Sequence, residues 1–260
     1  MYLNNHISNM MIMTDIKQPY NIRKYIDGDW KETTENVCIE SNYDLIINDR
    51  LIARFTILPI QLENFVVGYL ISEGIIDNIE KIKLIQVGES HIHVSIPEIK
   101  FTKEEFETFE LRTSGYKGPL EFSTNPIEPL ITTLEIKPKI IFKTQKILKD
   151  RAIIWKETGG THQAAIFDEK GNLKAFAEDC GRHNAIDKVI GMLYKKKINP
   201  EQYFLITTGR LSYGMVSKVA RAKIPLLVSN TAPLSKGIDL ARKVGIKLVC
   251  FSREPKLNVY

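Results

Sequence analysis

The spacing of hydrophobic residues changes along the first hundred residues, and each change predicts a different element. Alternating and β-branched residues from Val37 to Ile57 predict strands, with breaks at Ser41-Asn42 and Asn48-Asp49, where Asn and Asp suit turns. Apolar residues at helical spacing predict a helix that Pro59 begins and that ends near Gly74. The stretch from Ile82 to Ile96 predicts a hairpin. A small α+β unit follows from this order.

The second half alternates between short apolar strands and amphipathic helices. Helices are predicted at about 140–150, 182–197, 212–222 and 234–244, and strands at 162–167, 173–178, 203–207, 224–228 and 246–251. Such alternation predicts parallel strands with helices packed on the faces of the sheet. Ligands of such sheets bind beyond the carboxyl ends of the strands.

The segment between the two halves, residues 110–135, is rich in Gly and Pro and poor in regular pattern, which is typical of a long functional loop. We therefore expect a variable segment at 1–35, an α+β domain at 36–135 with a functional loop near 112–118, and an α/β domain at 136–260.

Composition narrows the class of protein. Of 260 residues, 43% are hydrophobic and 26% charged, which is ordinary for a folded globular chain. The cysteines number three and lie far apart, which disfavours a disulfide scaffold and favours a reducing compartment. No apolar run reaches the roughly 18 residues of a membrane helix, and the start lacks a secretory pattern, so we expect a cytoplasmic protein without a membrane span.

Charge is divided unequally between the halves. Residues 1–110 hold 10 basic and 18 acidic side chains, net −8, whereas residues 111–260 hold 26 and 13, net +13. A field of that sign favours an anionic partner such as a nucleotide, a phosphorylated cofactor or nucleic acid. Part of the excess, Lys195-Lys196-Lys197, is explained equally well as a solvated helix end.

Polar clusters occupy three junctions between predicted strands and helices. They are Thr158–His162, Glu178–Asn184 and Thr207–Ser212, and each contains glycine, which lets backbone N–H groups approach an anion. The candidate ligand-binding residues in and beside them are Gly159, Gly160, His162, Gly181, Arg182, His183, Asn184, Asp187, Gly209, Arg210 and Ser212. Together they predict a site for a phosphate-bearing small molecule.

The middle cluster carries the most specific expectation. Asp187 follows His183 by one helical turn, a spacing that would let the carboxylate orient the imidazole. Simpler explanations remain open at this stage: the glycines make turns, Asn184 caps a helix, and His183 is half-buried. Zinc-deaminase, P-loop and nucleophile-elbow patterns do not occur in the chain.

At these clusters the sequence resembles the formate dehydrogenase accessory family, the FdhD-type sulfur carriers. Thr158 to Ala165 is similar to the family's Thr-Gly-Gly-x-His-x-Ala-Ala segment, and Glu178 to Gly191 to its most characteristic block, with Cys180 where valine is usual. The resemblance extends over about residues 37–260 through Leu45–Asn48, Gly68–Ile76, Gly209–Ser212, Met215-Val216, Lys218, Ile224-Pro225, Ala232-Pro233 and Phe251–Tyr260.

The resemblance implies an α/β protein in which a smaller N-terminal α+β domain joins a cytidine-deaminase-like three-layer domain without zinc. It implies a factor that carries sulfur from a cysteine desulfurase to a molybdenum or tungsten bis-guanine-dinucleotide cofactor for formate dehydrogenase, with GDP as a mimic of the bound cofactor. It adds Lys218, Phe251, Ser252, Arg253, Glu254 and Pro255 to the cofactor-binding residues. By analogy, a homodimer is also expected.

The chain departs from the family at the persulfide loop. Ser114 and Lys117 stand where the family has the cysteines of its Cys-x-x-Cys motif, and neither side chain can hold a persulfide. Cys180 is the substitute candidate, because a helix N-terminus would lower its pKa, but a small apolar residue at a strand end is the simpler interpretation. The alternative function is a guanine-nucleotide or RNA-binding protein without sulfur transfer, and RNA is disfavoured because aromatic residues are not interleaved with the basic clusters.

Overall fold

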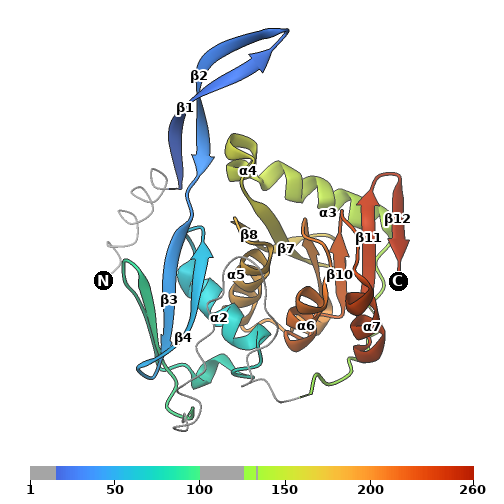
Figure 1. The fold of residues 1–260 in the computed structure, drawn as a ribbon. Coiled ribbons are helices and arrows are strands. Elements are labelled where there is room, and N and C mark those ends of the chain that lie inside the picture. Colours follow the sequence, from blue (N-terminus) through green and yellow to red (C-terminus); the bar gives the residue numbers. More distant parts are fainter. Residues whose placement is uncertain (1–15, 100–125, 133) are drawn as a thin grey trace.

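A mixed sheet forms the centre of the molecule. The computed structural model describes residues 16–99, 126–132 and 134–260, and its largest sheet has the strand order β12-β11-β10-β9-β7-β8 (Figure 1). The strands are β7 (His162–Asp168), β8 (Leu173–Asp179), β9 (Tyr203–Thr207), β10 (Leu226–Ser229), β11 (Lys247–Arg253) and β12 (Lys256–Val259). β9, β10 and β11 are parallel, which confirms that part of the sequence prediction. β7 runs antiparallel to β9, and β12, which the sequence pattern did not predict, runs antiparallel to β11.

Helices cover both faces of this sheet. α5 (Arg182–Lys195), α6 (Tyr213–Arg221) and α7 (Ser235–Val244) lie on one face, and α3 (Pro138–Arg151) lies on the other (Figure 1). The alternation of strand residues decides which helices they meet: Ala165 and Phe167 share a cluster with Ile141 of α3, whereas Ala164 and Ile166 join the cluster that contains α5. The predicted α/β class and the three layers are confirmed, and the likeness to cytidine deaminases stays a prediction.

A second, four-stranded sheet belongs to the N-terminal part. Its order is β4-β3-β6-β5, formed by β3 (Ser41–Ile47), β4 (Arg50–Ile57), β5 (Leu84–Val87) and β6 (His91–Ser95). The predicted break at Asn48-Asp49 is confirmed, and both residues have positive φ. The other predicted break was wrong, because β3 begins at Ser41 and the interruption is at residues 39–40.

The helix α2 (Leu62–Ser72) joins the two parts, and begins three residues after Pro59 rather than at it. It packs on α5 so closely that glycine is required on both helices. A Cβ on Gly68 would overlap the carbonyl oxygen of Asp187, and one on Gly191 would overlap that of Asn64. Apolar residues of both sheets consequently form one continuous core.

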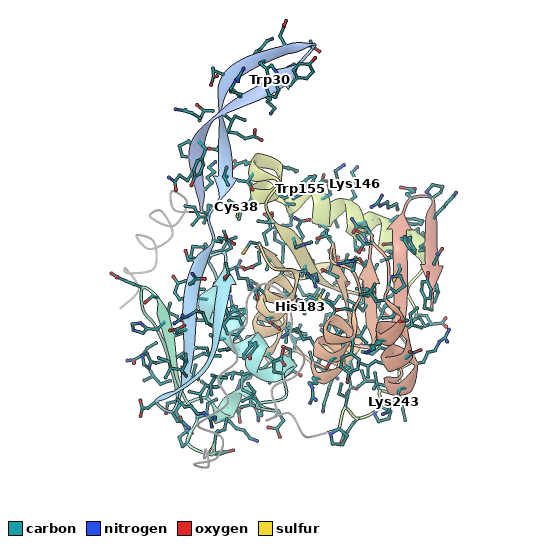
Figure 2. The ribbon with its side chains drawn as sticks, in the orientation of Figure 1. Trp30, Cys38, Lys146, Trp155, His183 and Lys243 are labelled. Atoms are coloured by element: carbon teal, nitrogen blue, oxygen red, sulfur yellow. The ribbon has the colours of Figure 1, made fainter. Side chains whose placement is uncertain are left out.

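The chain before the second sheet is a β-hairpin that projects from the body. β1 (Lys17–Ile26) and β2 (Asp29–Cys38) pair over their full length, with Trp30 near the tip and Cys38 at the base (Figure 2). The sequence analysis assigned no strand to residues 17–36, because their side chains are mostly polar on both faces. The remaining elements are α4 (Ile153–Thr158) and short 3-10 turns at Ile79–Lys81 and Pro200–Gln202. Within the described ranges, no helix has the length and apolar character needed to cross a membrane.

Candidate functional site

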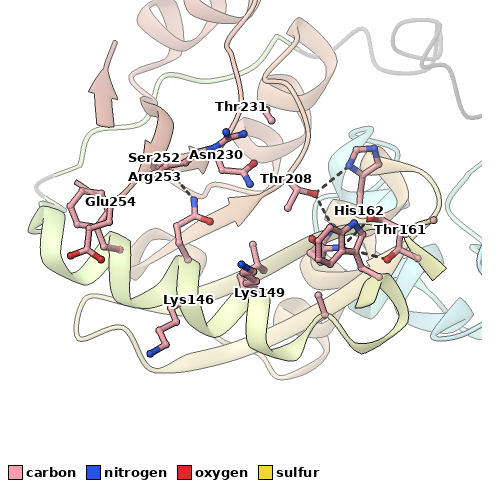
Figure 3. A pocket seen from close by; sticks show the side chains of 18 of the residues that line it. Lys146, Lys149, Thr161, His162, Thr208, Asn230, Thr231, Ser252, Arg253 and Glu254 are labelled. Carbon is pink, nitrogen blue, oxygen red and sulfur yellow. Dashed lines mark hydrogen bonds between the residues drawn. The ribbon is translucent and has the colours of Figure 1, made fainter. Parts of the chain in front are cut away.

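A cavity of about 860 Å³ opens where the carboxyl ends of the parallel strands meet α3 (Figure 3). Its sheet side is formed by Gly159, Gly160, Thr161, His162, Gln163, Cys180, Thr208, Asn230, Thr231, Ser252, Arg253 and Glu254. Its helical side is formed by Phe142, Gln145, Lys146, Leu148, Lys149, Ala152 and Trp155. The cavity therefore lies where ligands of open α/β sheets bind.

Some of the site residues that were predicted from the sequence line this cavity. Seven of those residues do: Gly159, Gly160, His162, Cys180, Ser252, Arg253 and Glu254. They meet because β7 pairs with β8 in a register that places His162 opposite Asp179, while β11 ends near the same edge of the sheet. Ser114 and Lys117 lie outside the described residues.

His162 links the first and third predicted clusters. Its Nδ1 lies 3.2 Å from Thr208 Oγ1, which also accepts a hydrogen bond of 3.1 Å from the Gln163 N–H. Burial lowers the pKa of His162, and the positive charge of Arg182 lowers it further. The imidazole is therefore neutral at pH 7 and offers one donor and one acceptor.

Arg182 and Arg210 bring two positive charges together beside His162, just outside the cavity lining. Burial and the charge of Arg210 lower the pKa of Arg182. The Nε of Arg182 is buried and has no hydrogen-bond partner among the described residues. An anion placed between the guanidinium groups would satisfy this donor and relieve the repulsion, as the phosphate prediction requires.

The second cluster is organised by a residue that the sequence analysis did not single out. Asp179 is fully buried, forms a 2.7 Å ion pair with Lys188, and accepts hydrogen bonds from the Gly181 N–H at 2.8 Å and Asn184 Nδ2 at 3.0 Å. It also accepts a hydrogen bond from the Leu58 N–H at 3.3 Å, which ties the N-terminal part to α5. Gly181 and Asn184 therefore support the site in this structure instead of lining it.

The predicted pairing of Asp187 with His183 is not the one that the structure shows. The Asp187 carboxylate accepts hydrogen bonds from Ser72 Oγ at 2.6 Å and from Lys218 Nζ at 2.9 Å. Lys218 also forms an ion pair with Glu73 at 2.8 Å. Asp187 and Lys218 thus belong to a buried charged cluster beneath α5, because the side of α5 that carries Asp187 faces α2 and α6.

The expectation for the Cys180 thiol was wrong in sign. Burial raises its pKa to about 12, and the negative charge of Asp179, whose Oδ1 accepts a hydrogen bond of 3.4 Å from the thiol, adds to the increase. These effects outweigh the helix N-terminus that the sequence analysis invoked. Cys38 lies close enough to act on the same thiol, and its own pKa is raised to about 11, first by burial and then by Asp179.

Gly209, Ser212, Phe251 and Pro255 were also predicted and are not among the residues that line the cavity. Ser212 caps α6 by accepting a hydrogen bond of 3.5 Å from the Met215 N–H, and the Gly209 N–H bonds to Thr207 Oγ1 at 3.2 Å. Phe251 has a φ of 50° and is half exposed, and Pro255 follows a cis peptide bond in the turn after β11. Within the ranges that the structure describes, no group of three or more His, Cys, Asp or Glu side chains is arranged to hold a metal ion.

The sequence analysis missed the helical wall and three polar residues of the sheet side, Gln163, Asn230 and Thr231. Phe142, Gln145 and Lys149 recur at helical spacing on α3, which is a signal for a shared face but does not say what that face meets. Asn230 directly follows β10, and its position at a strand end was a usable signal.

Comparisons with known proteins agree with this geometry. The model of a family described as the FdhD/NarQ family matches residues 38–260. The sulfur carrier protein FdhD of Methanothermobacter thermautotrophicus is 31% identical over 235 residues, which cover 90% of this chain and 93% of that protein. The sulfur carrier protein FdhD of Wolinella succinogenes is 33% identical over 236 residues, which cover 88% and 82%.

A solved structure shows the same fold. It is the crystal structure of a protein from Desulfotalea psychrophila that is assigned as a formate dehydrogenase accessory protein. The TM-score is 0.76 and the sequence identity 28%, with 94% of this chain and 96% of that chain covered. The similarity therefore extends over both parts of the molecule.

Proposed function

We propose that this chain, which belongs to the FdhD/NarQ family, is a maturation factor for formate dehydrogenase that binds the molybdenum or tungsten bis-guanine-dinucleotide cofactor. The observation that carries the proposal is the cavity at the strand ends, between the α3 lysines and His162, with Arg182 and Arg210 beside it. The names of the relatives, sulfur carrier and formate dehydrogenase accessory protein, supply the client and the process.

The residues fit one nucleotide arm of such a cofactor. A volume of about 860 Å³ lies within the usual range for small-molecule sites. Lys146 and Lys149 supply positive charge on one side, and the half-exposed Trp155 supplies an aromatic face on which a base can stack. The buried Nε of Arg182 offers a donor for a further phosphate oxygen.

Calorimetry with GDP tests the binding step. Changing both Lys146 and Lys149 to Gln should weaken GDP binding about tenfold or more, because charged hydrogen bonds contribute roughly 1.5–3 kcal/mol. Lys139→Gln with Lys143→Gln is the matched control, since both residues are exposed on the same helix, lie outside the cavity and remove the same charge. Absence of GDP binding by the unchanged chain would contradict the proposal.

The maturation step is tested with the client enzyme. Formate dehydrogenase produced together with this chain, and with no other protein of the family, should acquire formate-oxidising activity. The same expression with the doubly substituted Lys146 and Lys149 variant should give less activity, and the Lys139 and Lys143 control should not. Equal activity with and without the chain would remove the maturation role.

Sulfur transfer is the step on which this chain departs from its relatives. The proposed source of sulfur is a cysteine desulfurase. We expect no stable persulfide on Cys180, because a thiol with a pKa of about 12 has very little thiolate at neutral pH. Incubation with desulfurase and cysteine, followed by peptide mass spectrometry, measures it. A sulfur adduct on Cys180 that disappears in Cys180→Ala would overturn this expectation and establish direct relay.

A further inference from the structure

The loop that follows β10 is fixed by hydrogen bonds on both sides of one residue. Ser229 Oγ donates to the Gly209 carbonyl at 2.8 Å and accepts from the Thr231 N–H at 3.0 Å. It also lies 2.8 Å from Thr231 Oγ1. Asn230 stands between these two anchored residues, so its backbone has little freedom to move.

Two further contacts connect this loop to the walls of the cavity. Ser252 Oγ donates to the Ser229 carbonyl at 3.0 Å and accepts from Gln145 Nε2 of α3 at 2.6 Å. The Phe251 N–H donates to the Thr231 carbonyl at 3.0 Å. The loop is therefore held by α3 and β11 together, and the polar side chains around Asn230 have their partners within the protein.

The side-chain amide of Asn230 is different from its neighbours. It lines the cavity, and its Oδ1 is buried without a hydrogen-bond partner within residues 16–99, 126–132 and 134–260 (Figure 3). Leaving such an atom unsatisfied costs about 1–3 kcal/mol. A side chain that lines a cavity and carries such an atom on an anchored backbone is preorganised for a ligand that supplies the missing partner.

The chemistry of the amide defines that partner. A carboxamide offers one acceptor and one donor side by side, and its buried oxygen requires an N–H from the ligand. A lactam edge, in which a ring N–H is next to a carbonyl, meets both groups at once. We propose that Asn230 is a specificity-determining residue that pairs with the lactam edge of the bound heterocycle; this inference rests on the proposed function.

The lactam edge has two sources in the proposed cofactor, because guanine and pterin both carry one. GDP and tetrahydroneopterin are therefore the two probes, each titrated into the full chain and into Asn230→Ala. The matched control is Asn21→Ala, because Asn21 is exposed on β1 and lies outside the cavity. The source is the probe whose binding depends on Asn230.

We expect Asn230→Ala to weaken GDP binding about tenfold, the usual loss for one buried pair of hydrogen bonds. GDP methylated at N1 lacks the donor, so it should bind the unchanged chain about tenfold more weakly than GDP but bind Asn230→Ala with nearly the same affinity as GDP does. Asn230-dependent binding of tetrahydroneopterin alone would assign the pterin end and keep the inference.

Thermal unfolding without ligand separates recognition from a structural role. Asn230→Ala should unfold at the same temperature as the unchanged chain or higher, because the substitution removes an unsatisfied buried atom. A clear loss of stability, or affinities for GDP and for tetrahydroneopterin that are both equal in the two proteins, would overturn the inference. If the unchanged chain binds neither probe, the proposed function fails instead.

Discussion

At the level of single residues, the buried Lys218 lies between the carboxylates of Asp187 and Glu73, which would repel each other without it. The ammonium group is 2% exposed, with Ser72 Oγ 3.0 Å away. Burial favours the neutral amine, but the two carboxylates outweigh it and raise the pKa of Lys218. Without Lys218, two buried carboxylates would face each other in a space that water does not reach.

Lys218→Met should therefore destabilise the protein by about 3–5 kcal/mol near pH 8. Burial raises the pKa of Asp187 to about 6, above its ordinary value, so the folded state binds this proton more tightly than the unfolded state. In the unchanged protein the stability linked to this proton is complete below the unfolded pKa and is lost as pH rises through about 6. Lys218 lowers the pKa of Asp187, so without Lys218 the folded variant holds the proton to higher pH and its Asp187 is uncharged at pH 5. The deficit of Lys218→Met should consequently shrink at pH 5, as measured by urea unfolding.

The control for that measurement is Lys197→Met. Lys197 forms an exposed ion pair with Glu80, and such pairs contribute about 0–1 kcal/mol. Its effect should be small at both pH values. A Lys218→Met deficit that is equal at pH 5 and pH 8 would show that carboxylate repulsion is not its cause.

Among the elements, α2 and α5 pack closely because Gly68 and Gly191 have no side chains where the two helices cross. Gly191→Ala would put a Cβ into the carbonyl oxygen of Asn64, and a backbone atom cannot move aside as a flexible side chain can. We expect a loss of about 1–3 kcal/mol or more in urea unfolding, because overpacking at a rigid contact forces the helices apart. Lys195→Ala, which breaks only the exposed pair with Glu63 on the same two helices, should change stability by less than about 1 kcal/mol. Equal stability of the two variants would mean that the helices separate without cost.

The same helices show why elements were easier to predict than their partners. The stripe of α5 is readable because Ile186, Val189 and Ile190 are all buried in the core. What covers the other residues of the helix is decided by tertiary packing, and for this reason Asp187 was paired with His183 instead of Lys218. The hairpin of β1 and β2 was missed for a different reason: it has no buried face, so its sequence lacks the apolar alternation on which strand prediction depends.

For the whole molecule, the same limits explain which part of the site was foreseen. The polar clusters at junctions between strands and helices were sufficient for Gly159 and His162, because the ends of strands follow from local pattern, whereas Ser252 came from the family resemblance. They could not place α3 over those ends, since a helix of that sequence could have covered either face. Nor could they show that Asp179 is buried and raises the pKa of Cys180, which depends on Lys188 and Leu58 meeting it from distant segments.

The last prediction concerns the hairpin of β1 and β2, called the arm below, whose base and outer part have different surroundings. At its base, Ile16 and Cys38 join a small apolar cluster with Leu58 and Ile154. Further out, Arg23 lies over the ring of Trp30, and Tyr20, Tyr25, Ile26, Trp30 and Val37 are between 40% and 62% exposed.

Replacing residues 20–35 by an Asn-Gly turn between the paired Pro19 and Asn36 should thus leave the fold and GDP binding intact, with a change in unfolding temperature of no more than about 2 °C. The physical reason is that a two-stranded ribbon without a covered face contributes little to the stability of the domain to which it is attached. The comparison is Ile16→Ala, which leaves the arm at full length but opens the cluster at its base, and which should lower the unfolding temperature by several degrees. If the shortened chain unfolds at a much lower temperature while Ile16→Ala does not, the outer arm and not its base stabilises the body.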